Sequence, residues 1–260
     1  MKFEPRPLEE TQDISRGRAS WLDGLKLVVS AAVLLVTGYV LLGWLAEAVA
    51  MSIPDELEAR WFVAQIGDAE AEHPRFGEAQ ALFEELLEDE ALRQLPYQLF
   101  LLDMPEPNAF AVPGGGVGVT AGLLDTVKSE TGLAMVLAHE LGHHSKRHVL
   151  RGLGRGLLQQ SAVALLFGQS GGTELIEVGA LMAGRRYSRK AEYEADEFGF
   201  RLVQRHFEST EGATEFFEWA CREEHRKGDA GGWLRTHPLS RDRIDRMRRL
   251  DGGLRACELD

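Results

Sequence analysis

A motif with the spacing of a metal site lies near the middle of the sequence. His139 and His143 are four residues apart and Glu140 follows the first of them, within an apolar run of helical periodicity. Side chains four apart share one helix face, with Cβ atoms roughly 5–6 Å apart, so both imidazoles can reach one Zn²⁺ ion. Glu140 lies about 100° around the helix, where it can act as a general base instead of a ligand. We expect His144, rotated off this face, and His148, a turn beyond His143, to be structural or at most to support a ligand.

A second cluster downstream supplies the carboxylates that such a site needs. Glu192 and Asp196 are four residues apart within the stretch 188–199. A catalytic Zn²⁺ held by two histidines takes a third protein ligand, and a ligating histidine favours a carboxylate on its other ring nitrogen. We therefore expect Glu192 to be the third ligand and Asp196 to support a histidine. Glu194 is the rival ligand, but it lies about 200° from Glu192 on a helix. A solvated acidic helix face is the alternative for the whole cluster.

These motifs together resemble family forty-eight of the metallopeptidases, a gluzincin family that includes the HtpX and BepA proteases and the CAAX prenyl-protein proteases. The resemblance covers about residues 95–250, and it is carried by Asn108–Leu124, Val136–His143 with Arg147 and His148, Ser188–Gly199, and Thr236–Leu239 with Arg243 and Ile244. It implies an α+β fold that is mostly α-helical: a zincin-like metallopeptidase domain with a small β-hairpin or sheet beside the active-site helix.

The resemblance also implies endopeptidase chemistry with one Zn²⁺ per chain. The ion lowers the pKa of the attacking water, and Glu140 accepts the proton and returns it to the leaving amine. The tetrahedral oxyanion needs a further donor, for which Arg243 and His237 are the candidates. In BepA-like relatives the matching histidine approaches or ligates the metal and holds the enzyme inactive. His237 is therefore alternatively a fourth metal ligand that switches activity off. A helix N-terminal residue beside Pro238 is the remaining interpretation of His237.

Composition narrows the function classes. The net charge of −12 over 260 residues argues against nucleic-acid binding, because phosphate contacts need clustered Lys and Arg. Cys221 and Cys257 permit either one disulfide or two thiols. Two functions remain: a zinc endopeptidase acting on unfolded or misfolded envelope proteins, and a non-proteolytic, metal-stabilised chaperone or binding module. The presence of Glu140 favours the endopeptidase, because a binding module does not need the base.

The N-terminal part of the chain carries a membrane signal. Residues 27–46 form a run of twenty without a charge, which as a helix spans the roughly 30 Å of a bilayer core. Five basic residues precede this run, whereas Arg60 is the only one in the twenty residues that follow. The positive-inside rule then places the N-terminus in the cytoplasm and the catalytic domain across the membrane.

We expect three parts in the chain: a cytoplasmic tail (1–24), a transmembrane signal-anchor helix (25–50) and a zinc metallopeptidase domain (51–260). The expected location is the bacterial inner membrane, crossed once, with the catalytic domain in the periplasm. A cleaved signal peptide, with Ala48-Val49-Ala50 as its cleavage site, is the alternative.

The remaining elements follow from local patterns. We expect a helix from Asp55 with Trp61, Phe62, Val63 and Ile66 as its buried stripe, a second helix over roughly 76–92, and a strand over 97–102. Residues 108–113 and 117–120 flank three glycines and predict a hairpin. The hairpin offers an edge strand for extended substrate, or is a plain tight turn. The apolar, glycine-flanked stretch 154–184 predicts either a core helix, or a mobile lid or membrane-facing hairpin.

Overall fold

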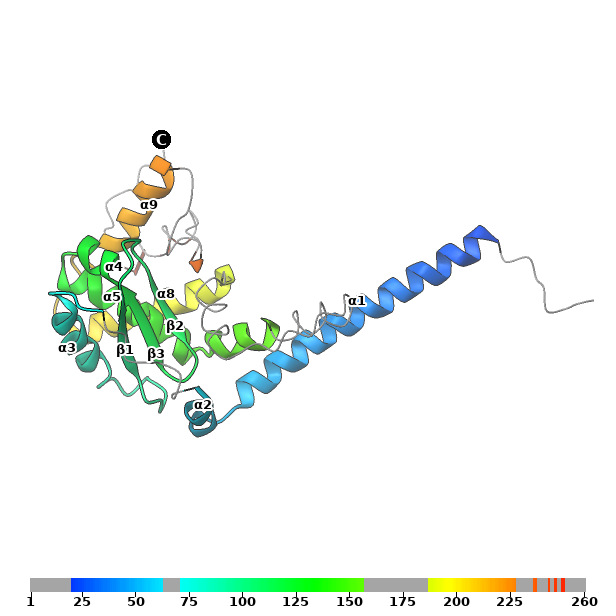
Figure 1. Ribbon diagram of the computed structural model, residues 1–260, viewed down its shortest axis with the longest axis horizontal. Helices are drawn as coiled ribbons and strands as arrows, with labels where there is room; N and C mark the ends of the chain where they lie inside the picture. Colours follow the sequence, from blue (N-terminus) through cyan, green and yellow to red (C-terminus); the bar gives the residue numbers. More distant parts are fainter. Residues whose placement is uncertain are drawn as a thin grey trace, which may run out of the picture. The chain divides into compact units, whose positions relative to one another are not determined.

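The computed structural model describes residues 20–62, 71–156 and 187–227, together with residues 236, 237, 243, 246, 249 and 250 of the C-terminal segment. The chain forms two compact units, residues 1–45 and residues 46–260 (Figure 1). Most of the stretch 154–184 lies outside the described residues, so the choice between core helix and lid stays a prediction. Cys221 is buried and disulfide-bonded, whereas Cys257 lies outside the described residues.

The first described helix is the long apolar α1 (Trp21–Ser52). It begins where Ser20 and Asp23 exchange hydrogen bonds: Ser20 N–H donates to Asp23 Oδ2 and Asp23 N–H donates to Ser20 Oγ, at 3.2 and 3.3 Å. Its large apolar side chains are exposed, as Leu34 at 73% and Trp44 at 67% illustrate. By length and composition it is the one helix among the described residues that could cross a membrane.

Helix α2 (Asp55–Phe62) begins at the expected residue but buries a different face. Trp61 is 54% exposed, so its place in the buried stripe was wrong, and residues 63 and 66 lie outside the described residues. Glu58 is buried instead, because its carboxylate pairs with Arg93 at 2.5 Å and accepts from the Gly114 N–H at 3.2 Å. A buried charge is stable only when it is paired in this way.

Helix α3 (Phe76–Leu86) buries Ala79, Leu82, Phe83 and Leu86, as the apolar pattern predicts, but it ends well before residue 92. Beyond it, the Asp89 side chain accepts a hydrogen bond from the Ala91 N–H at 2.8 Å. Such local side-chain bonds compete with the helical backbone bonds and favour a turn.

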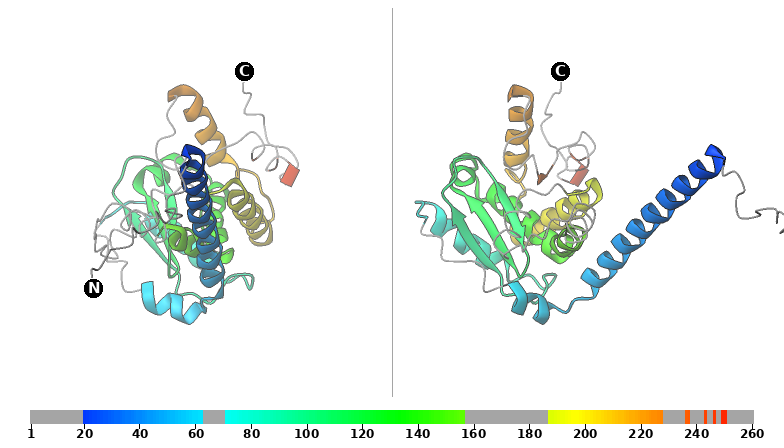
Figure 2. Two further views of the ribbon diagram at one scale, coloured as in Figure 1. Left: turned by 90° about the vertical axis from the view of Figure 1, so that its right-hand side faces the viewer. Right: turned by 45° about the vertical axis from the view of Figure 1, so that its right-hand side comes forward.

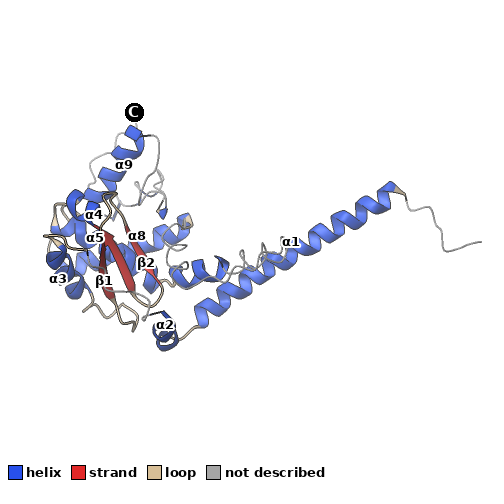
Figure 3. Cartoon of the chain, in the orientation of Figure 1, coloured by secondary structure: helices blue, strands red, loops and turns tan. Residues whose placement is uncertain are grey.

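A small mixed sheet contains β1 (Gln98–Leu102), β2 (Ala109–Val112) and β3 (Gly116–Thr120), in the order β1-β3-β2 (Figure 3). β3 pairs in parallel with β1 and antiparallel with β2, which confirms the predicted strand and hairpin. The hairpin turn needs its glycines, because Gly114 and Gly115 have φ values of 89° and 100°. The central strand β3 is buried along its whole length, so β1 and β2 are the edges.

Two helices at the centre of the second unit carry the motifs: α5 (Glu130–Ser145) and α8 (Arg189–His206). Ser129 and Ser188 cap their N-termini by accepting bonds from Gly132 and Ala191 N–H. In Figure 2 the two helices run close together beside the sheet, and α5 packs on both α8 and β2. The short α4 (Ala121–Thr126) follows β3, and α9 (Glu215–Lys227) packs on α5.

Glycines permit the close crossing of α5 and α8. A Cβ on Gly199 would lie 2.9 Å from the His139 backbone nitrogen, and one on Gly142 would lie 3.0 Å from the Ala195 backbone. The first contact is closer than real Cβ atoms come to their neighbours and the second is tighter than most of them, so the absence of side chains at Gly199 and Gly142 lets the two helices approach at the level of the histidine motif. The fold is thus mostly helical with a small sheet beside the motif helix, as expected.

Candidate metal site

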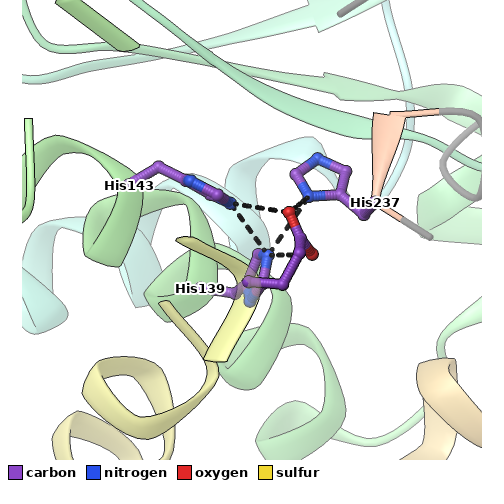
Figure 4. A group of neighbouring side chains, drawn as sticks. His139, His143 and His237 are labelled. Carbon is purple, nitrogen blue, oxygen red and sulfur yellow. Dashed lines mark hydrogen bonds and ion pairs between the residues drawn. The ribbon is translucent and has the colours of Figure 1, made fainter. Parts of the chain in front are cut away.

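Four buried side chains converge between α5, α8 and the C-terminal segment: His139, His143, Glu192 and His237 (Figure 4). The Nε2 atoms of His139 and His143 lie 3.1 Å apart. His237 Nδ1 lies 3.3 Å from His139 Nε2 and 3.3 Å from Glu192 Oε1. Glu192 Oε1 lies 3.7 Å from His143 Nε2. All four side chains are 0% exposed.

These spacings fit a four-coordinate metal ion. Around an ion with bonds of about 2.0–2.1 Å to its ligands, tetrahedral geometry separates neighbouring ligand atoms by roughly 3.3–3.4 Å. The four separations given above run from 3.1 to 3.7 Å, and all of the ligand atoms lie within 4.8 Å of one another. Three imidazole nitrogens and one carboxylate oxygen are also the ligand types that transition metals of this size prefer.

Burial favours the metal-binding protonation state of the three histidines, but it opposes ionisation of Glu192. Burial lowers the pKa of His139 below its ordinary value, and it lowers the pKa values of His143 and His237 well below theirs. Neutral imidazole is the form that ligates metals. Burial also raises the pKa of Glu192 to about 7, against the opposing effect of the Arg243 guanidinium.

A layer of charged groups surrounds Glu192 and the first histidine. His139 Nδ1 lies 3.0 Å from Asp196 Oδ1, the contact that the helical spacing of the carboxylates predicts. Arg243 is fully buried and donates to both Asp196 oxygens at 2.8 Å, while its third nitrogen lies 2.5 Å from Glu192. Burial alone would raise the pKa of Asp196, but Arg243 and His139 outweigh it, and the pKa lies below its ordinary value.

The second histidine contacts Tyr187, which the sequence analysis did not single out, and His148, which it expected at most to support a ligand. His143 stacks on Tyr187, with ring centroids 3.9 Å apart and an interplanar angle of 22°. Its Nδ1 lies 3.1 Å from Nδ1 of His148, and His148 Nε2 lies 3.0 Å from Glu194 Oε2. Glu194, the rival ligand, therefore contacts His148 and is not one of the four converging groups.

Glu140 and His144, which neighbour the motif histidines in sequence, lie on different sides of the motif helix. Glu140 is buried, with Oε1 3.6 Å from Nε2 of His237, so it borders the cluster without being one of its four members. His144 lies away from the cluster, as expected, with Nε2 3.0 Å from the Gly116 carbonyl oxygen of β3. That contact ties the motif helix to the sheet.

The fold and this cluster define a metallopeptidase. The family model described as Peptidase family M48 matches residues 73–251, and the chain belongs to that family. The chain is 32% identical over 181 residues to the mitochondrial metalloendopeptidase OMA1 of Schizosaccharomyces pombe, covering 67% of this chain and 52% of that one.

Two bacterial relatives are similarly related. The chain is 31% identical over 161 residues to a putative beta-barrel assembly-enhancing protease of Vibrio cholerae, covering 57% of this chain and 33% of that one. It is 30% identical over 148 residues to the metalloprotease LoiP of Escherichia coli, covering 54% and 57%. The matches thus span between a third and somewhat over half of the length of these three relatives.

Proposed function

We propose that the chain is a membrane-anchored, zinc-dependent endopeptidase that hydrolyses peptide bonds in unfolded or misfolded proteins of the bacterial envelope. The observation that carries the proposal is the buried convergence of His139, His143 and Glu192, with the Glu140 carboxylate beside it. The family membership supports metallopeptidase chemistry. Zinc, of one ion per chain, is proposed because the ligand types and their spacing suit it.

In the proposed mechanism, His139, His143 and Glu192 hold the ion, which when bound supplies Lewis-acid activation of water and of the scissile carbonyl. Glu140 accepts the proton of the attacking water and returns it to the leaving amine. Asp196 orients His139 through Nδ1, at 3.0 Å. Burial excludes bulk water from these groups, so each charge acts in a medium of low dielectric.

We propose that His237 is a metal ligand in an inactive resting state of the enzyme. Its Nδ1 lies among the other ligand atoms, so in this arrangement it takes the fourth position that a catalytic site keeps for water or substrate. The segment is held by the Tyr187 N–H, which donates to the Thr236 carbonyl at 3.0 Å, and by contact of the Tyr187 and His237 rings. Stabilisation of the oxyanion by His237 after it moves aside is the alternative role.

We place extended substrate along β2, an edge strand of the sheet that packs on α5. A peptide can add to such an edge through main-chain hydrogen bonds, with alternate side chains facing pockets. This mode suits unfolded substrates, because only an extended backbone can pair with the strand.

For topology, we propose a cytoplasmic tail (1–24), one span (25–50) and a periplasmic catalytic domain (51–260). The apolar helix α1, the basic residues before it and the bacterial relatives support this arrangement. A reporter that is active only in the periplasm should be active when it is fused after residue 260. The mature chain should keep its N-terminus. A cytoplasmic signal would invert the topology, and a mature chain starting at Met51 would replace the anchor by a signal peptide.

Digestion of unfolded casein by the purified full chain in detergent tests the activity. The wild type supplied with zinc should hold about one ion and cleave casein. Glu140→Gln should keep the metal but lose cleavage, whereas Glu130→Gln, at the exposed start of the same helix, should behave as wild type. Wild-type protein that holds no metal would refute the site. Metal binding with no cleavage by the wild type, but with suppression of casein aggregation by both wild type and Glu140→Gln, would favour the chaperone alternative.

A further inference from the structure

The contact between His143 and His148 depends on an unusual backbone turn. Helix α5 ends at Ser145, and helical structure resumes over 148–156 after a two-residue turn. Within that turn Arg147 has φ 55°, and no other non-glycine residue in the described parts of the chain has a positive φ. Residues with a Cβ rarely adopt this left-handed conformation, and such outliers cluster at functional sites.

The turn places His148 on the second histidine of the motif. On a continuous helix, residues five apart would point about 140° away from each other. In the folded chain their Nδ1 atoms lie 3.1 Å apart. The Arg147 side chain holds the turn in place, because its guanidinium donates to Asp55 at 2.8 Å and to the Ile53 carbonyl.

The contacts form a chain with one consistent direction of hydrogen bonding. Glu194, as a carboxylate, can only accept, so Nε2 of a neutral His148 donates to it at 3.0 Å. Nδ1 of His148 is then an acceptor and takes the Nδ1–H of His143 at 3.1 Å. His143 is left with its lone pair on Nε2, the atom that faces His139 Nε2 at 3.1 Å.

We propose that His148 and Glu194 are a positioning pair for His143: they select its Nε2 lone pair for the metal and fix the plane of its ring. This inference rests on the proposed metal site. The counterpart for His139 is its direct contact with Asp196. Both motif histidines are thus supported by a carboxylate of α8, His139 directly and His143 through His148. His148 is 3% exposed, so water has little access to its hydrogen bonds with His143 and Glu194.

The test is the zinc dissociation constant of the full chain in detergent, measured by competition with a chelator and without substrate. His148→Leu should weaken zinc binding by about 10–100-fold, the usual effect of losing a partner behind a ligand. His148→Asn should recover part of this loss, because its Oδ1 can occupy the acceptor position of Nδ1. A change that only disturbed packing would not be rescued by the more polar residue.

Glu194→Gln provides a second variant at a partly exposed position, where misfolding is not expected. Its matched control is Glu197→Gln on the same helix, since the two side chains are 34% and 32% exposed and both are ion-paired. Glu194→Gln should weaken zinc binding several-fold, and less than additively with His148→Leu, while Glu197→Gln should leave it unchanged.

Two outcomes overturn the inference. Either His148→Leu and Glu194→Gln bind zinc as tightly as the wild type, or His148→Asn binds it no better than His148→Leu. Failure of the proposed function would look different, because the wild type itself would then hold no metal. Thermal unfolding of each metal-free variant checks that the comparison is made between folded proteins.

Discussion

Replacement of Arg243 by Met separates two roles of its buried guanidinium. Arg243 is 0% exposed and bonds both Asp196 oxygens at 2.8 Å and one Glu192 oxygen at 2.5 Å. In this position it compensates the charge of two carboxylates, and that is the role we propose. The sequence-based alternative is stabilisation of the reacting oxyanion. Met fills most of the volume of the side chain and removes the charge.

The expected loss of stability follows from the two buried carboxylates that the substitution leaves without Arg243. Removing one partner of a buried ion pair costs about 3–5 kcal/mol, because the remaining charge stays desolvated. For a domain of this size, each kcal/mol lowers the melting temperature by roughly 2–4 °C. The metal-free Arg243→Met variant should therefore melt about 6–20 °C below the metal-free wild type. Added zinc should stabilise the variant more than the wild type, because the ion restores positive charge beside Glu192.

Thermal unfolding of the chelator-treated full chain, followed by intrinsic fluorescence, is the assay. Arg246→Met is the matched control: Arg246 lies on the same segment, but its side chain is 43% exposed and pairs with Glu197 at the surface, so its loss should cost less than about 1 kcal/mol. An Arg243→Met variant that melts within the range of this control, while its kcat falls, would refute charge compensation and favour the oxyanion role.

Three further predictions test the neighbouring groups. Glu192→Ala should lose both metal and proteolysis, whereas Glu194→Ala should keep both at a reduced metal affinity. Metal analysis of the two variants tests this expectation. The reverse pattern would mean that Glu194, and not Glu192, is the ligand. His237→Ala should raise casein cleavage by opening the fourth position, and a kcat lower by about 10²–10³-fold with zinc retained would instead indicate oxyanion stabilisation. Gly199→Ala should lower both melting temperature and zinc affinity, because its Cβ would meet the His139 backbone at 2.9 Å, whereas Gly77→Ala, with no atom within 4 Å, should be neutral or stabilising.

The parts of the site that helical periodicity controls could be predicted from the sequence. The spacing of His139 and His143 on one helix, and of Glu192 and Asp196 on another, becomes a fixed spatial relation once each segment is helical. The structure brings these residues together, with Glu140 beside them. The hairpin was likewise predictable, because its run of glycines marks a turn that needs positive φ.

Other features depend on contacts between distant parts of the chain, and local patterns do not contain them. Trp61 has the periodicity of a buried residue, yet Glu58 takes the buried face because Arg93 and the hairpin turn supply its partners. His148 was placed a turn beyond His143 because no Gly or Asn, the usual residues of a left-handed helix end, marks the break. Arg147 makes that break instead, held by contacts to residues 53 and 55.

Three of the four carboxylates of helix α8 contact the cluster or its supporting histidines, and their different partners follow from where the chain places those partners. Glu192 and Asp196 face α5 and reach the ligand cluster and His139 directly. Glu194 projects about 200° from Glu192, and it is connected to the cluster only through His148, which the chain carries to it after leaving α5 at Ser145. In the proposed site, both motif histidines are thus oriented by carboxylates of one helix, His139 directly and His143 through His148. A displacement of α8 would disturb the proposed ligand Glu192 and both supporting carboxylates together, so metal affinity should be more sensitive to the crossing of α5 and α8 than to any single supporting residue.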